Sequence, residues 1–558
     1  MVRRVFSFVY REVRGLHQAA YVLALFAFGS QILAIVRDRL LASAFGADSE
    51  LDVYYAAFRI PDLLYVGFAS VLSVYVLLPF VVAAQERAKS DSSVTILSQV
   101  FTLFLIGYSV LAAMVMVGAP VIMPWLFPGL AGESSTLVSL TQILLLQPLL
   151  LGVSSLCAVI TQSTKRFIIY AISPLLYNVG IIVGIMVFYP WFGLLGLGGG
   201  VVLGAVLHLL VQVPIVWRGT VPLRLTQVFV WSDIRDVLRS AIPRAVTLSL
   251  TQILLLLFTT VASTMVVGSV AVLQLGYNLQ SVPLVIIGMS YSVAAFPTLT
   301  TLYAKRDIIA FNAQLTTALR HIIFWSIPVI ALVVVLRAQL VRVLLGSGEF
   351  DWSDTRLTAA VLALFVVSLV AQAITMLLVR GMYAAGNTRV PLMLTLLGAG
   401  MVLVALAGLQ YVQVAHPGAW QSLESLLRIS GVPGAEVIML PLAYSLGMLF
   451  QLGLFLVAMI RMFGLVVAPL GRLFIQAMLA GFMGGLCAYL ALLFVVDGVN
   501  QETFIGIALQ GLVGGVCGLI GVVVTYRLLH APELFEISAA YHSRLFKRDV
   551  IPPQTDAP

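Results

Sequence analysis

The sequence predicts an all-α polytopic membrane protein: about 14 transmembrane helices form two pseudo-symmetric six-helix lobes around a central cavity, and two further helices follow at the C-terminus. Three observations predict this fold class. The chain of 558 residues is 61% hydrophobic and only 10% charged, which leaves too little polar surface for a water-soluble protein. Long apolar stretches recur along the whole chain. Two parts of the sequence also resemble each other.

Each apolar stretch is long enough to cross a bilayer, for which about 20 residues are needed. In chain order, we expect helices near 17–45, 52–84, 93–123, 136–162, 168–190, 192–217, 236–266, 269–303, 312–345, 356–385, 388–412, 436–462, 470–497 and 503–530. A basic arm, residues 1–16, precedes the first stretch. Because no small-residue cleavage site follows, we interpret that stretch as a retained helix and not as a signal peptide.

An internal repeat indicates the two lobes. Gln31-Ile32-Leu33, Gly46 and Pro61 recur in the same order, about 222 positions later, as Gln252-Ile253-Leu254, Gly268 and Pro283. Six helices separate the copies, so both have the same orientation in the membrane. The alternative is chance similarity between apolar helices. The repeat predicts an N-lobe at 17–217, a cytoplasmic linker at 218–235, a C-lobe at 236–462, helices 13 and 14 within 463–530, and a cytoplasmic tail at 531–558.

The net charge of +8 reports topology and not a nucleic-acid partner. Arginine and lysine are concentrated in alternate loops, whereas the opposite loops are poor in cations. This is the positive-inside bias of multi-pass membrane proteins. It predicts that both termini are cytoplasmic.

No motif for catalysis or metal binding is present. The sequence lacks a phosphate-binding glycine loop followed by lysine, a zinc-protease histidine pair and a nucleophile elbow. The three cysteines, Cys157, Cys487 and Cys517, lie in apolar stretches without metal-ligand spacing. We therefore expect no enzyme activity, no cofactor and no metal site.

Charged residues in the first two stretches are the main candidates for function, because a charge at membrane depth is costly. Arg37 and Asp38 are adjacent, so on a helix they point about 100° apart and cannot both face one direction. We expect Arg37 to face a cavity while Asp38 pairs with a neighbour. Arg59 and Asp62 are spaced to pair on one helical face. Pro61 between them frees backbone groups that can line a polar cavity. The alternative is that these charges seal the lobes or extend to the membrane surface.

Two further residues have open roles. Arg244 follows Pro243 at the start of a helix, where it either enters the cavity or extends towards the cytoplasm. Asn278 either lines the cavity or joins helices by hydrogen bonds. A cavity with arginines suits a phosphate group, which arginine binds through two N–H groups.

At these residues the chain resembles the MurJ (MviN) family of lipid II flippases, in the multidrug/oligosaccharidyl-lipid/polysaccharide exporter superfamily. The resemblance covers roughly residues 25–400. The matching strings are Ile35-Val36-Arg37-Asp38 with Ala44-Phe45-Gly46-Ala47, Asp52 through Pro61, Arg166-Phe167 through Pro174 and Asn178, Pro243 through Gln252, Gly348-Glu349-Phe350, and Tyr383-Ala384 through Thr388 and Pro391.

The chain departs from the family pattern inside the expected cavity. The family has arginines where this chain has Gln31, Tyr65 and Asn278, and acidic residues where it has Ser70 and Phe258. Arg37 is retained, and Arg59 matches a position that is normally basic. These differences put the exact lipid and sodium coupling in question.

The resemblance implies a flippase that moves undecaprenyl-pyrophosphate-linked peptidoglycan precursor, lipid II, from the inner to the outer leaflet of the bacterial cytoplasmic membrane by alternating access. Arg37 would bind the pyrophosphate, with Arg59 and Asn278 in the substrate cavity and Asp52 at the outer gate. Its partners would be the lipid-linked glycan, membrane lipids and proteins of cell-envelope synthesis. The alternatives are a flippase or exporter for another lipid-linked oligosaccharide or amphiphile, and a non-transporting cell-envelope scaffold.

Overall fold

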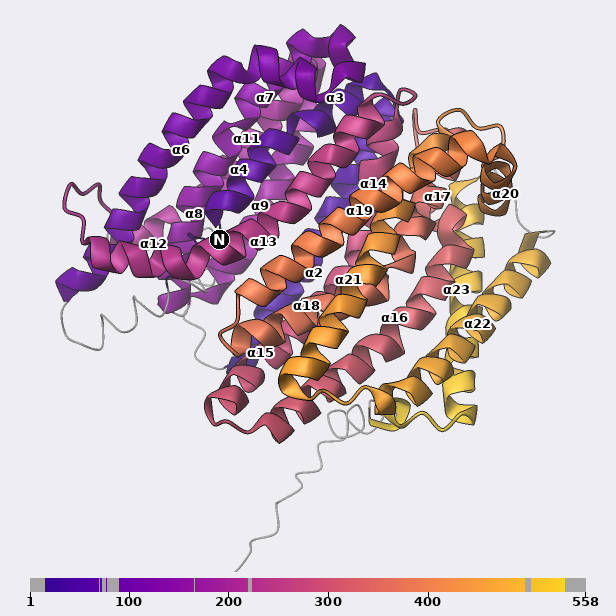
Figure 1. The fold of residues 1–558 in the computed structure, drawn as a ribbon. Coiled ribbons are helices and arrows are strands. Elements are labelled where there is room, and N and C mark those ends of the chain that lie inside the picture. The colour runs from indigo at the N-terminus through magenta and orange to yellow at the C-terminus, as the bar shows by residue number, and fades with distance from the viewer. Residues whose placement is uncertain are drawn as a thin grey trace, which may run out of the picture. The chain divides into compact units, whose positions relative to one another are not determined.

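The computed structural model describes residues 16–69, 71, 72, 77, 90–164, 166–218, 223–496 and 503–536, and in this part of the chain all regular structure is helical (Figure 1). The basic arm up to residue 15, Ser70, most of the expected second helix beyond residue 72 and the tail beyond residue 536 lie outside the described residues.

Every expected helix interval coincides with one or more observed helices. The first half contains α2 (Leu16–Phe45), α3 (Ser49–Ala57), α4 (Arg59–Ala69), α6 (Ser90–Leu126), η1 (Pro128–Glu133), α7 (Ser134–Leu144), α8 (Leu146–Ser163), α9 (Phe167–Val183), η2 (Gly184–Phe188), α10 (Tyr189–Phe192), α11 (Leu194–Leu210) and α12 (Val213–Arg218). The second half contains α13 (Trp231–Ser263), α14 (Ser269–Leu284), η3 (Val285–Met289), α15 (Ser290–Ala304), α16 (Ile308–Leu345), α17 (Trp352–Val367), α18 (Leu369–Ala384), α19 (Arg389–Ala415), α20 (Pro417–Leu427), η4 (Ala435–Ile438), α21 (Met439–Phe463), α22 (Ala468–Val496) and α23 (Phe504–Leu528).

The all-helical membrane fold is confirmed. Among the described residues, 11 helices are long and apolar enough to cross a membrane, and the number rises to 12 if α17 and α18, bent by 44° at their junction, form one span. The expected count of fourteen is consistent with these helices but stays a prediction.

Two of the helix breaks occur where the internal repeat places proline. Pro61 lies in the first turn of α4, directly after the break at Phe58. Pro283 lies near the end of α14, and the wider turn η3 follows it. Proline has no N–H to donate and its ring crowds the preceding turn, so both breaks have the same physical cause.

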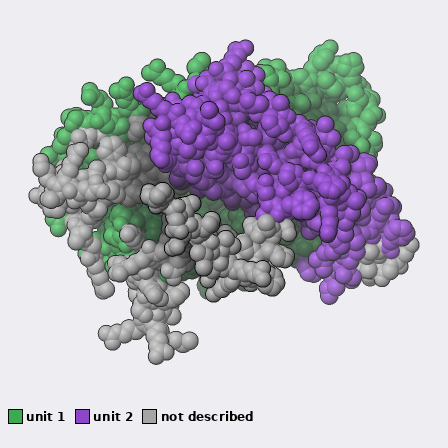
Figure 2. Space-filling model, turned by 90° about the horizontal axis from the view of Figure 1, so that it is seen from below, with its two compact units in different colours: residues 1–282, 341–365, 387–451 green, residues 283–340, 366–386, 452–558 purple. Residues whose placement is uncertain are grey.

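The chain divides into two compact units (Figure 2). Unit 1 comprises Met1–Val282, Val341–Phe365 and Asn387–Gln451. Within it, α9 and the η2 turn that follows it approach α11 closely through facing glycines: a Cβ added at Gly180 of α9 would collide with the Cα of Gly204, and one at Gly184 of η2 with the Cα of Gly200. Small residues permit such contact between membrane helices.

Unit 2 comprises Pro283–Leu340, Val366–Gly386 and Leu452–Pro558. Here α22 packs along α23, and the hydroxyl of Tyr526 on α23 donates to the backbone oxygen of Phe324 on α16 at 2.7 Å. Arg320 on α16 forms an ion pair of 2.6 Å with the buried Glu533. These contacts connect the last described segment to the helices of unit 2.

Candidate functional site

Unit 1 contains a cavity of about 180 Å³. Its walls come from α2, α3, α4, α8, α9 and α14, together with Phe58 between α3 and α4. The lining residues are Arg37, Leu41, Tyr54, Tyr55, Phe58, Arg59, Asp62, Gln147, Tyr177, Ile181, Gln274 and Asn278. The structure thus brings together four of the residues expected from the sequence, namely Arg37, Arg59, Asp62 and Asn278.

The guanidinium of Arg37 is held by its neighbour in the chain. Its Nε and Nη2 donate to one carboxylate oxygen of Asp38 at 2.9 and 2.7 Å, and its Nη1 donates to the amide oxygen of Asn178 on α9 at 3.2 Å. Arg37 faces the cavity as expected, and Asp38 pairs with Arg37 itself as well as with a residue of another helix. The Arg37 side chain is long enough to turn back across the angle between adjacent helical positions, so its charge is balanced within α2.

The second carboxylate oxygen of Asp38 starts a line of hydrogen bonds to α14. It accepts from Nδ2 of Asn278 at 3.0 Å. The amide oxygen of Asn278 accepts in turn from Gln274, one helical turn earlier, at 2.7 Å. Gln274 then accepts from Nη2 of Arg59 at 2.5 Å. One continuous network therefore joins the two arginines of the cavity.

Within the described part of the chain, the hydrogen-bond partners of Arg59 are neutral. Its side chain is buried, with 6% of the residue exposed, and besides Gln274 it donates from Nε to the hydroxyl of Thr259 on α13 at 2.7 Å. The expected pairing with Asp62 was wrong: of these two described residues, no ion pair within 4.0 Å is formed. The guanidinium is turned towards α13 and α14, while Asp62 stays on the cavity wall. Arg59 is thus the cavity arginine without a carboxylate in contact.

Pro61 explains how Arg59 reaches this position. Since proline cannot donate to the carbonyl of Ala57, the helix is interrupted there. The chain turns at Phe58, and the N–H of Asp62 bonds to the carbonyl of Phe58 at 2.8 Å as α4 begins. Arg59 is therefore the first residue of a new helix segment, beside the cavity.

Asp52 occupies a second site, at the start of α14. It is 2% exposed, and its two carboxylate oxygens accept from the backbone N–H groups of Gly268 and Ala271, both at 2.7 Å. These N–H groups have no partner inside the helix, and the helix dipole favours a negative charge at this end. Asp52 thus connects α3 to the N-terminus of α14.

Asp354 on α17 makes a corresponding contact to the loop after α2. Its carboxylate accepts from the backbone N–H of Ala47 at 3.1 Å, and the N–H of Glu349 donates to the carbonyl of Ser43 at 3.0 Å. Asp354 was not among the residues expected from the sequence, although it follows the Gly348-Glu349-Phe350 string by only a few residues. Gly46 and Gly268, equivalent in the repeat, both have positive φ, at 62° and 91°, and each loop contacts a carboxylate from elsewhere in unit 1.

The remaining candidates lie apart from the cavity. Arg244 is half-buried in α13 and is not among the lining residues, and neither Gln31 nor Tyr65 lines the cavity. Phe258 is fully buried in an edge-to-face contact with Tyr444 at 6.2 Å, so the position that is acidic in the related family belongs to the apolar core here. Gln274 and Thr259 were also missed; the spacing of Gln274 four residues before Asn278 was the available signal.

Most of the chain is similar in sequence to known proteins. The family model described as "Lipid II flippase MurJ" matches residues 41–509. A lipid II flippase MurJ from Burkholderia cenocepacia is 24% identical over 389 residues, covering 68% of this chain and 75% of the relative. A probable lipid II flippase MurJ from Rickettsia prowazekii is 23% identical, covering 74% of this chain and 84% of the relative.

Solved structures show the same fold. The inward closed conformation of a lipid II flippase MurJ aligns with a TM-score of 0.70 at 19% identity, over 91% of this chain and 99% of that one. An inward-facing multidrug resistance MATE family transporter of the MOP superfamily aligns with a TM-score of 0.62 at 16% identity, over 78% of this chain and 95% of that one.

Proposed function

Because the chain belongs to the lipid II flippase MurJ family, we propose that it moves lipid II from the inner to the outer leaflet of the bacterial cytoplasmic membrane. It is a multi-pass membrane protein with the helical fold of that family. The observation on which the proposal depends is the position of Arg59, a buried cation on the cavity wall whose hydrogen-bond partners, Gln274 and Thr259, are both neutral.

Arg59, more than Arg37, is suited to bind the pyrophosphate. Arg37 already has a carboxylate in contact, so a phosphate must compete with Asp38 for it. Arg59 contacts two neutral acceptors, and a phosphate oxygen forms a stronger, charge-assisted hydrogen bond than a neutral amide or hydroxyl oxygen does. An entering anion therefore replaces Gln274 or Thr259 at Arg59 more readily than it replaces Asp38 at Arg37.

Asn278 has a positioning role in this mechanism. It donates to Asp38 and accepts from Gln274, so it connects the fixed pair on α2 to the partner of Arg59. Where related proteins have an arginine, this chain has a neutral donor that holds the network together. The reduced number of cations favours, as the second candidate, a lipid-linked oligosaccharide with a different head group.

The same bonds suggest how binding is coupled to alternating access. With the N-lobe at 17–217 and the C-lobe at 236–462, the Asp38–Asn278, Arg59–Gln274 and Arg59–Thr259 bonds all join one lobe to the other. An anion that takes the place of Gln274 and Thr259 removes two of these bonds. A ligand shifts a conformational equilibrium only through such differential contacts. We place the outer gate at Asp52 and Asp354, whose bonds to Gly268, Ala271 and Ala47 must break when the outer side opens.

The deciding experiment is rescue of a bacterium depleted of its own lipid II flippase. The parent chain, Arg59→Ala, Arg37→Ala and the control Arg356→Ala would be compared at equal membrane abundance. Arg356 is half-buried, bonds to the carbonyl of Arg428 and does not line the cavity. The proposal expects rescue by the parent and the control, none by Arg59→Ala and partial rescue by Arg37→Ala. Failure of a well-inserted parent would reject lipid II as the substrate.

A further inference from the structure

The chain between α12 and α13 contains an extended segment, residues 223–230, that is fastened along α6; we refer to it as the strap. Three backbone N–H groups of the strap donate to side chains of α6: Arg224 to Ser98 at 3.4 Å, Thr226 to Thr102 at 3.0 Å and Val230 to Gln99 at 2.8 Å. All three acceptors are buried. Three of the backbone N–H groups of the strap are thus directed inward and satisfied there.

The side chains that the strap and its flanks direct outward are largely apolar. Leu225 is 70% exposed and Val228 67%, and tryptophans stand at both ends, with Trp217 84% and Trp231 67% exposed. On the inner side, Ile234, Val237 and Ala241 of α13 are buried, and Val237 and Ala241 belong to the same apolar core as Val100 and Phe104 of α6. Large apolar side chains on the outer face of a fixed segment indicate a surface that is covered by another apolar medium.

The strap lies between two membrane spans. One candidate span ends at Trp217 and the next begins at Arg244, so the strap and the first turns of α13 lie on the chain between two spans, on one side of the membrane. Tryptophan is enriched at the membrane surface because its ring is apolar and its N–H is polar. An amphipathic surface segment inserts its apolar side chains among the lipid head groups and places its cations at the phosphates.

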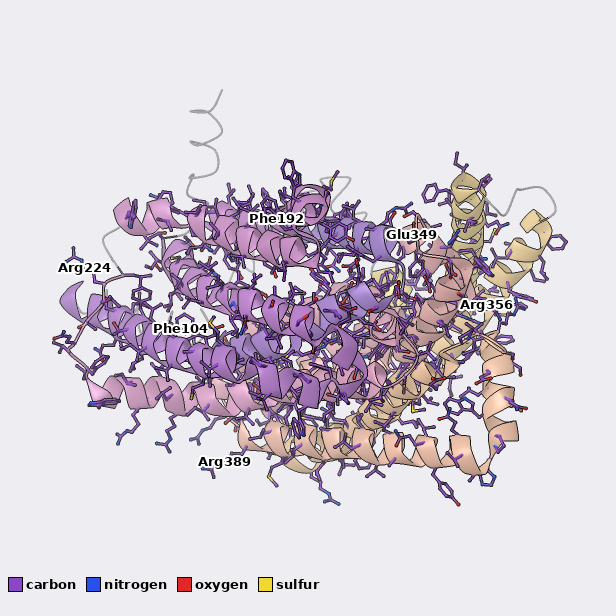
Figure 3. All side chains as sticks on the ribbon, turned by 90° about the horizontal axis from the view of Figure 1, so that it is seen from above. Phe104, Phe192, Arg224, Glu349, Arg356 and Arg389 are labelled. Atoms are coloured by element: carbon purple, nitrogen blue, oxygen red, sulfur yellow. The ribbon has the colours of Figure 1, made fainter. Side chains whose placement is uncertain are left out.

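The net positive charge of residues 217–244 indicates which lipid head groups this surface would attract. Residues 217–244 contain five arginines and two aspartates, and the side chains of Arg224, Arg235 and Arg239 are exposed, as is Asp236. Figure 3 shows Arg224 projecting outward at the edge of the ribbon. Basic residues at a membrane surface attract anionic lipids. We propose that the strap and the first turns of α13 form a binding surface for anionic phospholipids, held in place by Ser98, Gln99 and Thr102.

The test measures the head-group preference at Trp231 directly. In a chain that keeps Trp231 and replaces the other six tryptophans by phenylalanine, Trp231 fluorescence would be measured in phosphatidylcholine nanodiscs. A minor fraction of the lipid would carry bromine on the acyl chain close to the head group, on either phosphatidylglycerol or phosphatidylcholine. We expect brominated phosphatidylglycerol to quench roughly twofold more than brominated phosphatidylcholine.

The variant Arg224→Gln/Arg235→Gln/Arg239→Gln should abolish this preference. The control Arg389→Gln/Arg461→Gln/Arg472→Gln makes the same change of charge at exposed arginines elsewhere and should keep it. Soluble glycerophosphoglycerol should not compete, since the apolar contacts need an acyl chain. As a second measurement, native mass spectrometry of the chain with all its tryptophans should show phosphatidylglycerol retained over phosphatidylcholine, and less so in the triple strap variant.

Equal quenching by the two lipids, or a preference that survives the strap variant, would overturn the proposal. Absence of quenching by either lipid would mean that the surface faces water or a protein partner, which also overturns it. Neither readout requires transport, so the result is independent of whether lipid II is the substrate.

Discussion

Asn278 donates a hydrogen bond of 3.0 Å to Asp38, a residue 240 positions earlier in the chain. This bond joins α14 to α2 and shares the Asp38 carboxylate between a neutral donor and the guanidinium of Arg37. Since Asp38 already engages Arg37, whereas no described carboxylate contacts Arg59, we expect an anion to bind Arg59 more readily than Arg37.

Replacing Arg59 should weaken anion binding more than replacing Arg37. A hydrogen bond to a charged group contributes about 1.5–3 kcal/mol, so Arg59→Ala should weaken pyrophosphate binding roughly 10- to 100-fold. Arg59→Lys keeps the charge without the planar pair of donors and should be intermediate. Isothermal titration of the purified chain with inorganic pyrophosphate would measure this. An equal or larger loss in Arg37→Ala would contradict the assignment.

Removing the neutral partner of Arg59 should have the opposite effect. In Gln274→Ala the guanidinium no longer has to leave Gln274 before it binds an anion, so pyrophosphate affinity should rise a few-fold, by about 1 kcal/mol. The matched control is Gln142→Ala, because Gln142 bonds to the carbonyl of Met116 and does not line the cavity. Unchanged or lower affinity in Gln274→Ala would show that Gln274 does not compete with the anion.

Replacing Asp38 should lower the free energy of unfolding, because Asp38 balances the charge of Arg37. Asp38→Leu leaves Arg37 without its carboxylate, and breaking a buried ion pair costs about 3–5 kcal/mol. The Arg37 side chain is 21% exposed, so we expect a loss near the lower end of that range, measured as the free energy of unfolding in detergent. The double variant Arg37→Met/Asp38→Leu should recover most of it. If the double variant loses as much free energy of unfolding as the single variants Arg37→Met and Asp38→Leu together, the two residues are not coupled.

Asp52→Asn should loosen the contact between α3 and α14. The amide keeps one acceptor oxygen but loses the second acceptor and the charge that favours a helix N-terminus, a change of about 1 kcal/mol. In a cysteine-free background with Ser269→Cys, which is 4% exposed in the parent, labelling by a membrane-impermeant maleimide should become faster. Asp48→Asn, at an exposed carboxylate in the same region, is the control. If the labelling rate is the same in Asp52→Asn and Asp48→Asn, the bonds of Asp52 do not hold the outer gate closed.

Gly268 should tolerate alanine less than Gly386 does, although both have positive φ. Gly268 has φ of 91° and an added Cβ would collide with the carbonyl of Ala47, whereas Gly386 has φ of 74° and nothing within 4 Å of an added Cβ. Both alanine variants incur the backbone strain of about 1–2 kcal/mol. Only Gly268→Ala should also displace the loop, so its thermal unfolding temperature should fall further. Similar decreases in unfolding temperature for Gly268→Ala and Gly386→Ala would indicate that backbone strain, and not the collision with Ala47, determines the loss of stability.

Several features followed from local sequence because their causes are local. The breaks at Pro61 and Pro283 follow from the missing N–H of proline, and the positive φ at Gly46 and Gly268 accords with the repeat in which these residues correspond. The predicted ion pair between Arg59 and Asp62 does not form, although the two residues have the spacing for it. Spacing predicts which side chains can meet on an isolated helix, whereas here the neighbouring helices provide Thr259 and Gln274 as partners of Arg59.

The sequence by itself determined the membrane class, the order of the helices and the residues whose charge at membrane depth required an explanation, since hydropathy and proline chemistry act within a few residues. Only the tertiary structure decided which of the two cavity arginines is balanced by a carboxylate, and that Asp52 and Asp354 bond to distant loops. Asp52 and Asp354 bond to residues more than 200 positions away, and the partners of Arg59 lie 200 and 215 positions away. The packing of helices brings these residues within hydrogen-bond distance, and no local pattern encodes it.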